Sequence, residues 1–245
     1  MPAPAASERL PALALLAGGL ATRLRPLTLT MPKSLVQVGG EPFIAHQLRL
    51  LASQGISDIV VCAGHLGKQI TEYVGDGAGF GCRVRYSFDG DRQLGTGGAL
   101  QKAMPLLGER CFVMYGDSYL PTRFAPVLRA FERAGLPALM TVFRNAGQWD
   151  TSNVEFVDRV IRRYDKVNRT SAMLHIDYGL GLLAVDALKA WPADSVFNLA
   201  DFFSHLAQRG LLAGFEVFER FYEIGSPSGL EETAAFLQQL NGKGS

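Results

Sequence analysis

Short apolar runs alternate with amphipathic segments over the first 143 residues of the chain. Apolar runs of about four to eight residues are typical of buried strands, whereas a period of about 3.6 residues is typical of helices. A regular alternation of the two predicts a mostly parallel sheet with helices on both faces. The predicted strands are 13–16, 58–62, 83–88, 111–115 and 138–143, and the predicted helices are 42–53, 66–74, 96–106 and 121–134.

The pattern changes after residue 143, where strands and helices no longer alternate. Neither a Pro/Ser-rich linker nor an internal repeat separates this part from the first, so we expect one domain over residues 10–240. The ends, 1–9 and 241–245, are expected to be loose. The second part is predicted to hold a hairpin at 154–156 and 160–164, strands at 176–185 and 212–218, and helices near 186–191, 198–209 and 228–240.

The composition excludes several classes of protein. Hydrophobic residues make up 48% and charged residues 19% of the 245, which is enough for a large core. A net charge of +1 gives no bulk attraction to nucleic acid or to an acidic membrane, so neither partner is expected. Residues 1–9 lack the features of a secretory signal, and the apolar runs are shorter than the roughly 18 residues of a membrane helix. A cytoplasmic protein is therefore expected.

The cysteines and histidines point away from thiol and zinc chemistry. Three cysteines without CxxC spacing argue against a disulfide framework and against a zinc site. Cys62 and Cys111 lie in apolar runs and are predicted to be buried thiols. The histidines, at 46, 65, 175 and 205, show no ligand spacing.

Two polar features directly follow predicted strands. Gly18 and Gly19 come after the strand at 13–16, and Asp117 comes after the strand at 111–115. Ligands of parallel α/β sheets bind at the carboxyl ends of the strands. Both features are therefore expected on the same rim of the sheet.

The stretch LAGGLATRLRPLTLTMPKSL, residues 16–35, has the residue types of a polyphosphate site. The glycine pair allows backbone N–H groups to approach an anion, and Arg23, Arg25 and Lys33 supply three cations. Neither known phosphate loop fits. Pro32 stands where a Walker loop needs the glycine before its lysine, and Arg23 stands where a dinucleotide fingerprint needs its third glycine.

The same stretch resembles the signature loop of the sugar-1-phosphate nucleotidyltransferases, (L)AGGxGTRLxPLTxxxPKxL. One departure is Ala21, where the family commonly has glycine. The resemblance implies a GT-A-type, Rossmann-like α/β fold with a smaller mixed sugar-binding part. It implies that residues 10–143 bind the nucleotide and 144–240 the sugar phosphate. The chain ends soon after its last motif, so the β-helix that some relatives append is not expected.

Further segments resemble the family in the same order. QLGTGGA, from residue 93, is similar to the segment that lies against the nucleobase, and the Gly116-Asp117 pair to a motif whose aspartate holds Mg²⁺. The segment 221–227, FYEIGSP, resembles a late D-x-G-x-P motif whose acid is the second metal ligand; here that acid is Glu223. Lys166 matches a lysine that reaches the sugar phosphate, and 176–179 a turn that touches the sugar, although Asp177 and Tyr178 depart from the usual pairs.

The expected site follows from these matches. Arg23, Lys33 and Asp117 are the expected catalytic residues, and Mg²⁺ is expected on Asp117 and Glu223. Lys166, Asp177 and Gly179 are expected at the sugar phosphate, joined by Asn153 from a polar run before a strand. The expected nucleotide contacts are Ala17, Gly18, Gly19, Thr22, Arg25, Gln93, Gly95 and Thr96.

The resemblance implies that an NTP and a sugar 1-phosphate react to give an NDP-sugar and pyrophosphate. The expected substrates are GTP and a mannose- or heptose-type 1-phosphate, with UTP-dependent uridylyl transfer as the alternative. A regulatory homologue that binds nucleotide sugars without chemistry is disfavoured because Arg23, Lys33, Asp117 and Lys166 are all present. A glycosyltransferase is disfavoured because residues 116–119 lack an Asp-x-Asp pair. The oligomeric state is left open, a homo-oligomer included.

Overall fold

The computed structural model describes residues 9–19, 22–145, 147–193 and 195–242. Most of the ends that are expected to be loose, 1–8 and 243–245, lie outside these ranges. Ala21, where the signature loop departs from the family pattern, also lies outside them.

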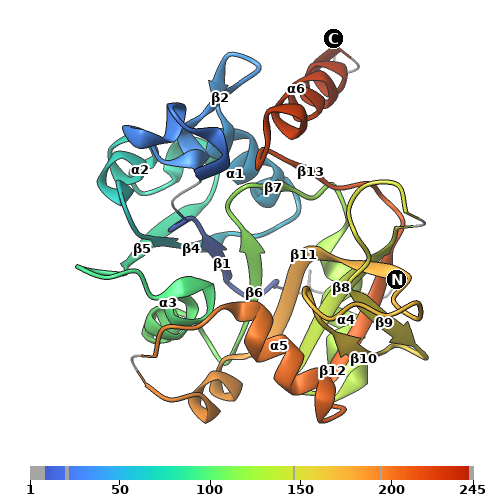
Figure 1. Ribbon diagram of the computed structural model, residues 1–245. Helices are drawn as coiled ribbons and strands as arrows, with labels where there is room; N and C mark the ends of the chain where they lie inside the picture. Colours follow the sequence, from blue (N-terminus) through green and yellow to red (C-terminus); the bar gives the residue numbers. More distant parts are fainter. Residues whose placement is uncertain (1–8, 20–21, 146, 194, 243–245) are drawn as a thin grey trace, which may run out of the picture.

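One nine-stranded sheet runs through both parts of the chain (Figure 1). Its strands follow the spatial order β5-β4-β1-β6-β11-β8-β12-β10-β9, with an additional pairing between β11 and β9. The strands are β1 (Leu13–Leu16), β4 (Asp58–Ala63), β5 (Arg83–Phe88), β6 (Arg110–Tyr115), β8 (Ala138–Arg144), β9 (Val154–Val157), β10 (Val160–Tyr164), β11 (His175–Ala184) and β12 (Leu212–Val217).

The predicted parallel sheet is confirmed for β5-β4-β1-β6, whose neighbours all pair in parallel. Beyond β6 the sheet is mixed, which corrects the expectation of a mostly parallel sheet. Strand β11 pairs antiparallel with both β6 and β8, while β8 and β12 are parallel. Strands β10 and β9 complete the sheet with antiparallel pairings. The order of the elements along the chain does not show that β11 lies between β6 and β8 in the sheet, although both precede it in the sequence.

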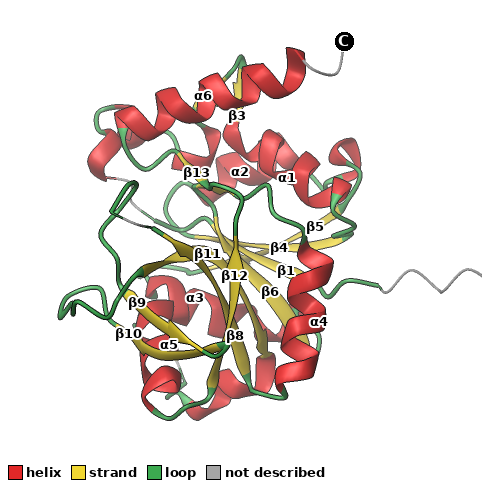
Figure 2. Ribbon diagram, turned by 90° about the vertical axis from the view of Figure 1, so that its right-hand side faces the viewer, coloured by secondary structure: helices red, strands yellow, loops and turns green. Residues whose placement is uncertain are grey.

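Helices cover both faces of the sheet, as predicted (Figure 2). On one face, α1 (Phe43–Ser53), α2 (Gly67–Val74) and α4 (Phe124–Ala134) share a core with Leu13 and Leu15 of β1. On the other, α3 (Gly95–Ala103) and α5 (Leu199–Gln208) pack on Ala14 and Leu16. Successive residues of β1 thus face opposite cores, because side chains alternate along a strand.

Several predicted helices differ at their ends. Helix α4 begins at Phe124, not at residue 121, because Arg123 is extended, with φ −85° and ψ 130°. Helix α3 ends at Ala103 and continues as a 3-10 turn, η5 (Met104–Leu106), and the helix predicted near 186–191 is a 3-10 helix, η6 (Val185–Ala190). The remaining 3-10 turns are η1 (Thr22–Leu24), η2 (Leu27–Leu29), η3 (Lys33–Leu35) and η4 (Ala78–Phe80).

A third, smaller hydrophobic core, besides those on the two faces of the sheet, lies over the carboxyl ends of the central strands. Helix α6 (Pro227–Gly242) packs with Val36, Val38 and Phe43. The short strand β13 (Tyr222–Glu223) pairs antiparallel with β7 (Ser118–Tyr119), and β2 (Gln37–Val38) pairs with β3 (Glu41–Pro42). The β13–β7 pairing brings the late motif beside Asp117. In the described part of the chain, no helix has the length and apolar character needed to cross a membrane.

Candidate active site

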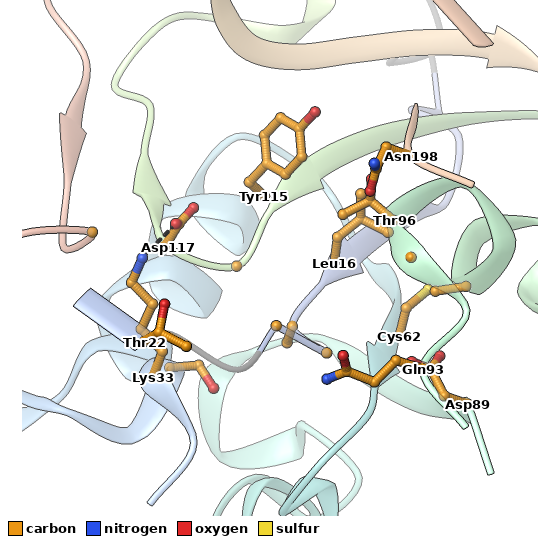
Figure 3. Close-up of a pocket in the computed structure, with 18 of the residues that line it drawn as sticks. Leu16, Thr22, Lys33, Cys62, Asp89, Gln93, Thr96, Tyr115, Asp117 and Asn198 are labelled. Atoms are coloured by element: carbon orange, nitrogen blue, oxygen red, sulfur yellow. Dashed lines mark hydrogen bonds and ion pairs between the residues drawn. The ribbon is translucent and has the colours of Figure 1, made fainter. Parts of the chain in front are cut away.

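A cavity of about 410 Å³ opens where β1, β4 and β6 end, on the rim that the sequence predicts (Figure 3). Thr22, Lys33 and Asp117 stand on one side of it, which we call the Lys33 end, and Asp89, Gln93 and Thr96 on the other, the Gln93 end. The lining residues are Leu16, Ala17, Gly18, Gly19, Thr22, Arg23, Lys33, Ser34, Cys62, Asp89, Gln93, Gly95, Thr96, Ala99, Tyr115, Gly116, Asp117, Asn198 and Gly225.

The floor of the cavity is the backbone that leaves β1. The Ala17 N–H donates to the Cys62 carbonyl at 2.8 Å, and the Gly116 N–H donates to the Leu16 carbonyl at 2.9 Å. A Cβ on Gly18 would lie only 3.1 Å from the Gly64 nitrogen, so glycine lets two loops at neighbouring strand ends approach each other. The predicted convergence of strand ends therefore exists, and it leaves the 17–19 backbone open to a ligand.

An ion pair marks the Lys33 end. Lys33 Nζ lies 2.6 Å from Asp117 Oδ2, and the exposed fractions of the two side chains are 15% and 34%. Arg23 is exposed and lines the cavity, whereas Arg25 is exposed but is not among the lining residues. The structure thus brings Arg23 and Lys33 of the 16–35 stretch to the same cavity as the distant Asp117, and it leaves Arg25 outside.

Asp117 is held in place through its backbone. The Ile224 N–H donates to the Asp117 carbonyl at 2.9 Å, which ties the strand end to the late motif. The buried Gln47 side chain donates to the neighbouring Tyr115 and Ser118 carbonyls at 3.3 and 2.7 Å. The carboxylate therefore projects from a rigid turn, which favours a fixed charge arrangement at this end.

The Gln93 end is built from two segments about a hundred residues apart. The Leu199 N–H donates to Thr96 Oγ1 at 2.8 Å, and the Gly97 N–H donates to the Phe197 carbonyl at 2.9 Å. Gln93, Gly95 and Thr96, all predicted contacts, line the cavity here, and Asn198 joins them. The start of α3 and the start of α5 thus form one wall.

Gly97→Ala is expected to loosen this wall. A Cβ on Gly97 would overlap the Phe197 ring, so the variant should be destabilised by about 1–3 kcal/mol, measured by urea unfolding. Gly108→Ala is the matched control, because a Cβ there meets nothing within 4 Å, and it should change the unfolding free energy by less than about 0.5 kcal/mol. Equal stability of both variants would show that Phe197 does not pack on α3.

Asp89 and Asn198 were missed by sequence reasoning. Asp89 directly follows β5, so the strand-end rule that located Asp117 would also have found it. Only 8% of Asp89 is exposed, and burial raises the pKa of its carboxyl, against the Leu94 N–H and Lys102, which lower it. Asn198 caps α5 and reaches the cavity only because residues 195–198 fold back on α3, which local sequence does not show.

Glu223 occupies the predicted segment but does not line the cavity. Strand pairing places it opposite Ser118, next to Asp117. Its carboxylate turns toward its own chain, where it accepts the Gly225 N–H and, at 3.1 Å, the Ser226 hydroxyl. Gly225 from the same motif does line the cavity.

The four predicted sugar-phosphate residues form a separate group beside Tyr115. Lys166 Nζ lies 5.9 Å from the centre of the Tyr115 ring and 5.8 Å from that of Tyr164. The Asp177 carboxylate accepts the Tyr164 hydroxyl at 2.8 Å and the Gly179 N–H at 3.0 Å. Buried Asn153 accepts the Asp177 N–H at 3.1 Å.

This group reaches the cavity through Tyr115. A Cβ on Gly179 would lie 3.7 Å from the Tyr115 ring, and Tyr115 is itself a lining residue. Burial, together with the carboxylates of Asp177 and Asp117, raises the pKa of Tyr115 well above its usual value, so the phenol stays protonated. None of Asn153, Lys166, Asp177 and Gly179 is among the lining residues themselves.

The predicted burial of the thiols is confirmed. Cys62 and Cys111 are both buried, and burial raises the pKa of the Cys111 thiol to about 12. Cys62 lines the cavity, but burial raises its pKa as well. Because the thiolate is the reactive form, neither side chain is suited to nucleophilic catalysis.

Comparison with known proteins shows the family to which the chain belongs. A model of the nucleotidyl transferase family matches residues 13–152, more than half of the chain. The chain belongs to the nucleotidyl transferase family. The match contains the lining residues from the loop after β1 to Asp117, whereas Asn198 and Gly225 lie outside it.

Relatives within the nucleotidyl transferase family differ in the nucleotide that they are named for. The chain is 41% identical over 104 residues to N-acetylmuramate alpha-1-phosphate uridylyltransferase of Neisseria meningitidis, covering 42% of this chain and 45% of that protein. It is 24% identical over 214 residues to D-glycero-alpha-D-manno-heptose 1-phosphate guanylyltransferase of Campylobacter jejuni, covering 87% and 94%. Of the length of two curated relatives that it matches, the chain spans 35% and 45%.

A solved structure has the same fold. HddC from Yersinia pseudotuberculosis, complexed with GMP-PN, has a TM-score of 0.77 at 20% identity and covers 93% of this chain and 100% of its own. This likeness confirms the Rossmann-like α/β fold.

One of the two predicted metal ligands suits a magnesium ion. Asp117 offers a partly exposed carboxylate to the cavity, and Mg²⁺ is usually held by one or two carboxylates together with substrate phosphates. Glu223 does not fit this role, because its oxygens accept donors of its own turn. Among the described residues, no group of three or more His, Cys, Asp or Glu side chains is arranged to hold a metal ion.

Proposed function

We propose that this family member transfers a nucleotidyl group from an NTP to a sugar 1-phosphate, releasing pyrophosphate and forming an NDP-sugar. The observation that carries the proposal is the shared cavity, in which Arg23, Lys33 and Asp117 line the same space as the Gln93 end. A triphosphate at the Lys33 end and a nucleobase at the Gln93 end match the charge and the shape of the two sides. The relatives' names support the same reaction class.

The reaction needs placement and charge cancellation more than covalent help. A phosphate oxygen of the sugar 1-phosphate attacks the α-phosphorus of the NTP in line, the bond to the bridging oxygen breaks, and pyrophosphate leaves. Arg23 stabilises the charge on the pentacoordinate phosphorus and on the departing pyrophosphate. The backbone at Gly18 and Gly19 and the Lys33 ammonium hold the triphosphate.

Asp117 is the residue that would hold Mg²⁺ together with phosphate oxygens. When bound, the ion supplies Lewis-acid charge neutralisation and fixes the orientation of the phosphates. Lys33 Nζ lies 2.6 Å from the Asp117 carboxylate, so the ammonium stands beside the position that the phosphates would take.

We also propose the division of the chain into two functional parts. Residues 10–143 supply the nucleotide contacts, and 144–240 supply the sugar phosphate contacts through Lys166, Asn153 and the turn from Asp177 to Gly179. Lys166 supports this role because its Nζ lies 5.9 Å from the centre of the Tyr115 ring, and Tyr115 lines the cavity. The N–H groups of Asn168 and Val167 lower the pKa of Asp165 to about 2 and fix the turn that carries this lysine.

Asp89 favours GTP as the nucleotide. A carboxylate accepts hydrogen bonds only, and guanine presents two adjacent donors, N1–H and the N2 amino group, on one edge. Uracil presents a single N3–H between two carbonyl oxygens, which a carboxylate repels. UTP remains the second candidate, supported by the uridylyltransferase relative.

Asp89→Asn is expected to weaken the preference for GTP. The amide replaces one acceptor by a donor, so the ratio of kcat/KM for GTP to that for UTP should fall by about 10–100-fold. Asp91→Asn, an exposed neighbour that does not line the cavity, is the control and should leave the ratio unchanged. An unchanged ratio in Asp89→Asn would remove Asp89 from base recognition.

The proposed function is tested by a matrix of the four NTPs against sugar 1-phosphates, scored by pyrophosphate release. Glucose, mannose, heptose, N-acetylglucosamine and N-acetylmuramic acid 1-phosphates form the sugar panel. Turnover is expected with GTP and a mannose- or heptose-type sugar. Binding of nucleotide sugars without turnover in any well would instead indicate the non-catalytic homologue.

A further inference from the structure

We infer that Glu223 is a positioning residue of this site and not its second metal ligand. The inference rests on the proposed function, since it assigns a role within the nucleotidyl transfer site. It also departs from the metal role that the late motif implies. Four observations carry it: the enclosure of the carboxylate, its place at a helix start, the contacts of the turn that it closes, and the length of glutamate.

The Glu223 carboxylate is enclosed by its own turn. One oxygen accepts the Gly225 N–H, and the other lies 3.1 Å from the Ser226 hydroxyl. A Cβ on either Gly225 or Gly229 would collide with this carboxylate. Glycine at both positions therefore provides the space that the side chain fills.

The same turn is closed from two further sides. Ser226 Oγ accepts the Gly229 N–H at 3.0 Å, and Thr233, from the second turn of α6, donates its hydroxyl to the Glu223 carbonyl at 2.9 Å. Helix α6 begins at Pro227, where N–H groups lack helical partners and the helix dipole favours a negative charge. Ser226 Oγ supplies the acceptor for the Gly229 N–H, and the Glu223 carboxylate supplies the negative charge beside this helix start.

The turn that Glu223 closes is part of the cavity wall. Gly225 lines the cavity, and its Cβ position lies 3.2 Å from Lys33 Nζ. The next N–H after Glu223, that of Ile224, donates to the Asp117 carbonyl at 2.9 Å. Glu223 thus fixes a backbone that contacts both members of the Lys33–Asp117 pair, although its own side chain does not face the cavity.

The length of glutamate explains why the role differs from that of the usual aspartate. Its extra methylene lets the carboxylate fold back past Gly225 to reach Ser226 at the helix start. A metal ion that recruited this carboxylate would leave the Gly225 N–H and the Ser226 hydroxyl without the acceptor that they have here. The observed contacts favour the closed turn.

Two variants separate positioning from ligation. Glu223→Gln keeps the size of the side chain but removes its charge and one acceptor. Gly229→Ala keeps the carboxylate and pushes it out of the turn. Glu231→Gln, an exposed acid of the same helix, is the matched control, and Asp117→Asn is the reference for a lost metal ligand.

Each variant is measured in three ways: kcat at saturating Mg²⁺, the Mg²⁺ concentration that half-saturates binding of a non-hydrolysable GTP analogue by calorimetry, and Tm. Positioning predicts that Glu223→Gln and Gly229→Ala both lose about tenfold in kcat, while the Mg²⁺ half-saturation stays within about twofold of wild type. Glu231→Gln should match wild type in all three.

Two results would overturn the inference. A rise of tenfold or more in the Mg²⁺ half-saturation of Glu223→Gln, as in Asp117→Asn, would make Glu223 a metal ligand. An unchanged kcat in both variants, with only Tm lowered, would leave Glu223 with a structural role alone. Lack of turnover by the wild type would count against the proposed function instead, and the calorimetric measurement would still report on Glu223.

Discussion

Arg23→Ala is expected to lower kcat/KM for nucleotidyl transfer by about 10²–10³-fold, the usual cost of removing a preorganised partner of transition-state charge. Arg23 lines the cavity next to Thr22 and is exposed. Its guanidinium is therefore available to the phosphates and is not packed in the hydrophobic core. Folding should therefore be unchanged. Pyrophosphate release and thermal unfolding measure the two effects separately.

Arg25→Ala is the matched control for this prediction. Arg25 belongs to the same segment and is equally exposed, but it is absent from the cavity lining. We expect its loss to change kcat/KM by less than about threefold, as for a solvated surface charge. If Arg25→Ala cost more activity than Arg23→Ala, the triphosphate would have to contact Arg25, as the sequence analysis expects.

Asp117→Asn is expected to lower kcat by about 10²–10³-fold and to raise the Mg²⁺ requirement. The amide cannot replace the carboxylate as a hard anionic ligand, and it leaves the largely buried Lys33 ammonium without its counter-charge. Stability should change by about 1 kcal/mol or less, because the carboxylate side chain is one-third exposed. Turnover at varied Mg²⁺ and urea unfolding provide the measurements.

Asp186→Asn is the control that removes a lysine–aspartate ion pair outside the cavity. Asp186 also pairs with a lysine at 2.6 Å, Lys189, but the exposed fractions of these side chains are 81% and 66%. This variant should keep wild-type turnover and Mg²⁺ dependence. Near-wild-type pyrophosphate release by Asp117→Asn would contradict both the metal role of Asp117 and the assignment of the Lys33 end.

Local sequence was sufficient to predict the position of a site residue wherever that position depends on a single strand. The four-residue run of β1 and the glycines after it place the 17–19 backbone at a strand end, and the same rule places Asp117. Strand-end logic works because parallel strands share one direction, so their carboxyl ends meet without further information. That is why Arg23, Lys33 and Asp117 could be predicted to share a rim.

The direction in which a side chain points could not be predicted from local sequence in the same way. The resemblance assigns Glu223 a place beside Asp117, and the β13–β7 pairing puts its backbone there. The carboxylate nevertheless accepts hydrogen bonds from Gly225 and Ser226 of its own turn. Arg25 differs from Arg23 in a similar way: Arg23 lies in η1 and lines the cavity, whereas Arg25 lies just after η1 and is not among the lining residues.

The sequence by itself determined the strand–helix alternation, the buried strands and the cationic loop, because periodicity and apolar runs fix which face of an element is buried. Tertiary structure alone decided that β11 lies between β6 and β8 and that Asn198 joins the Gln93 end. Strand order and loop packing depend on contacts between residues far apart in the chain, such as the Leu199 N–H on Thr96, and no local pattern encodes such contacts.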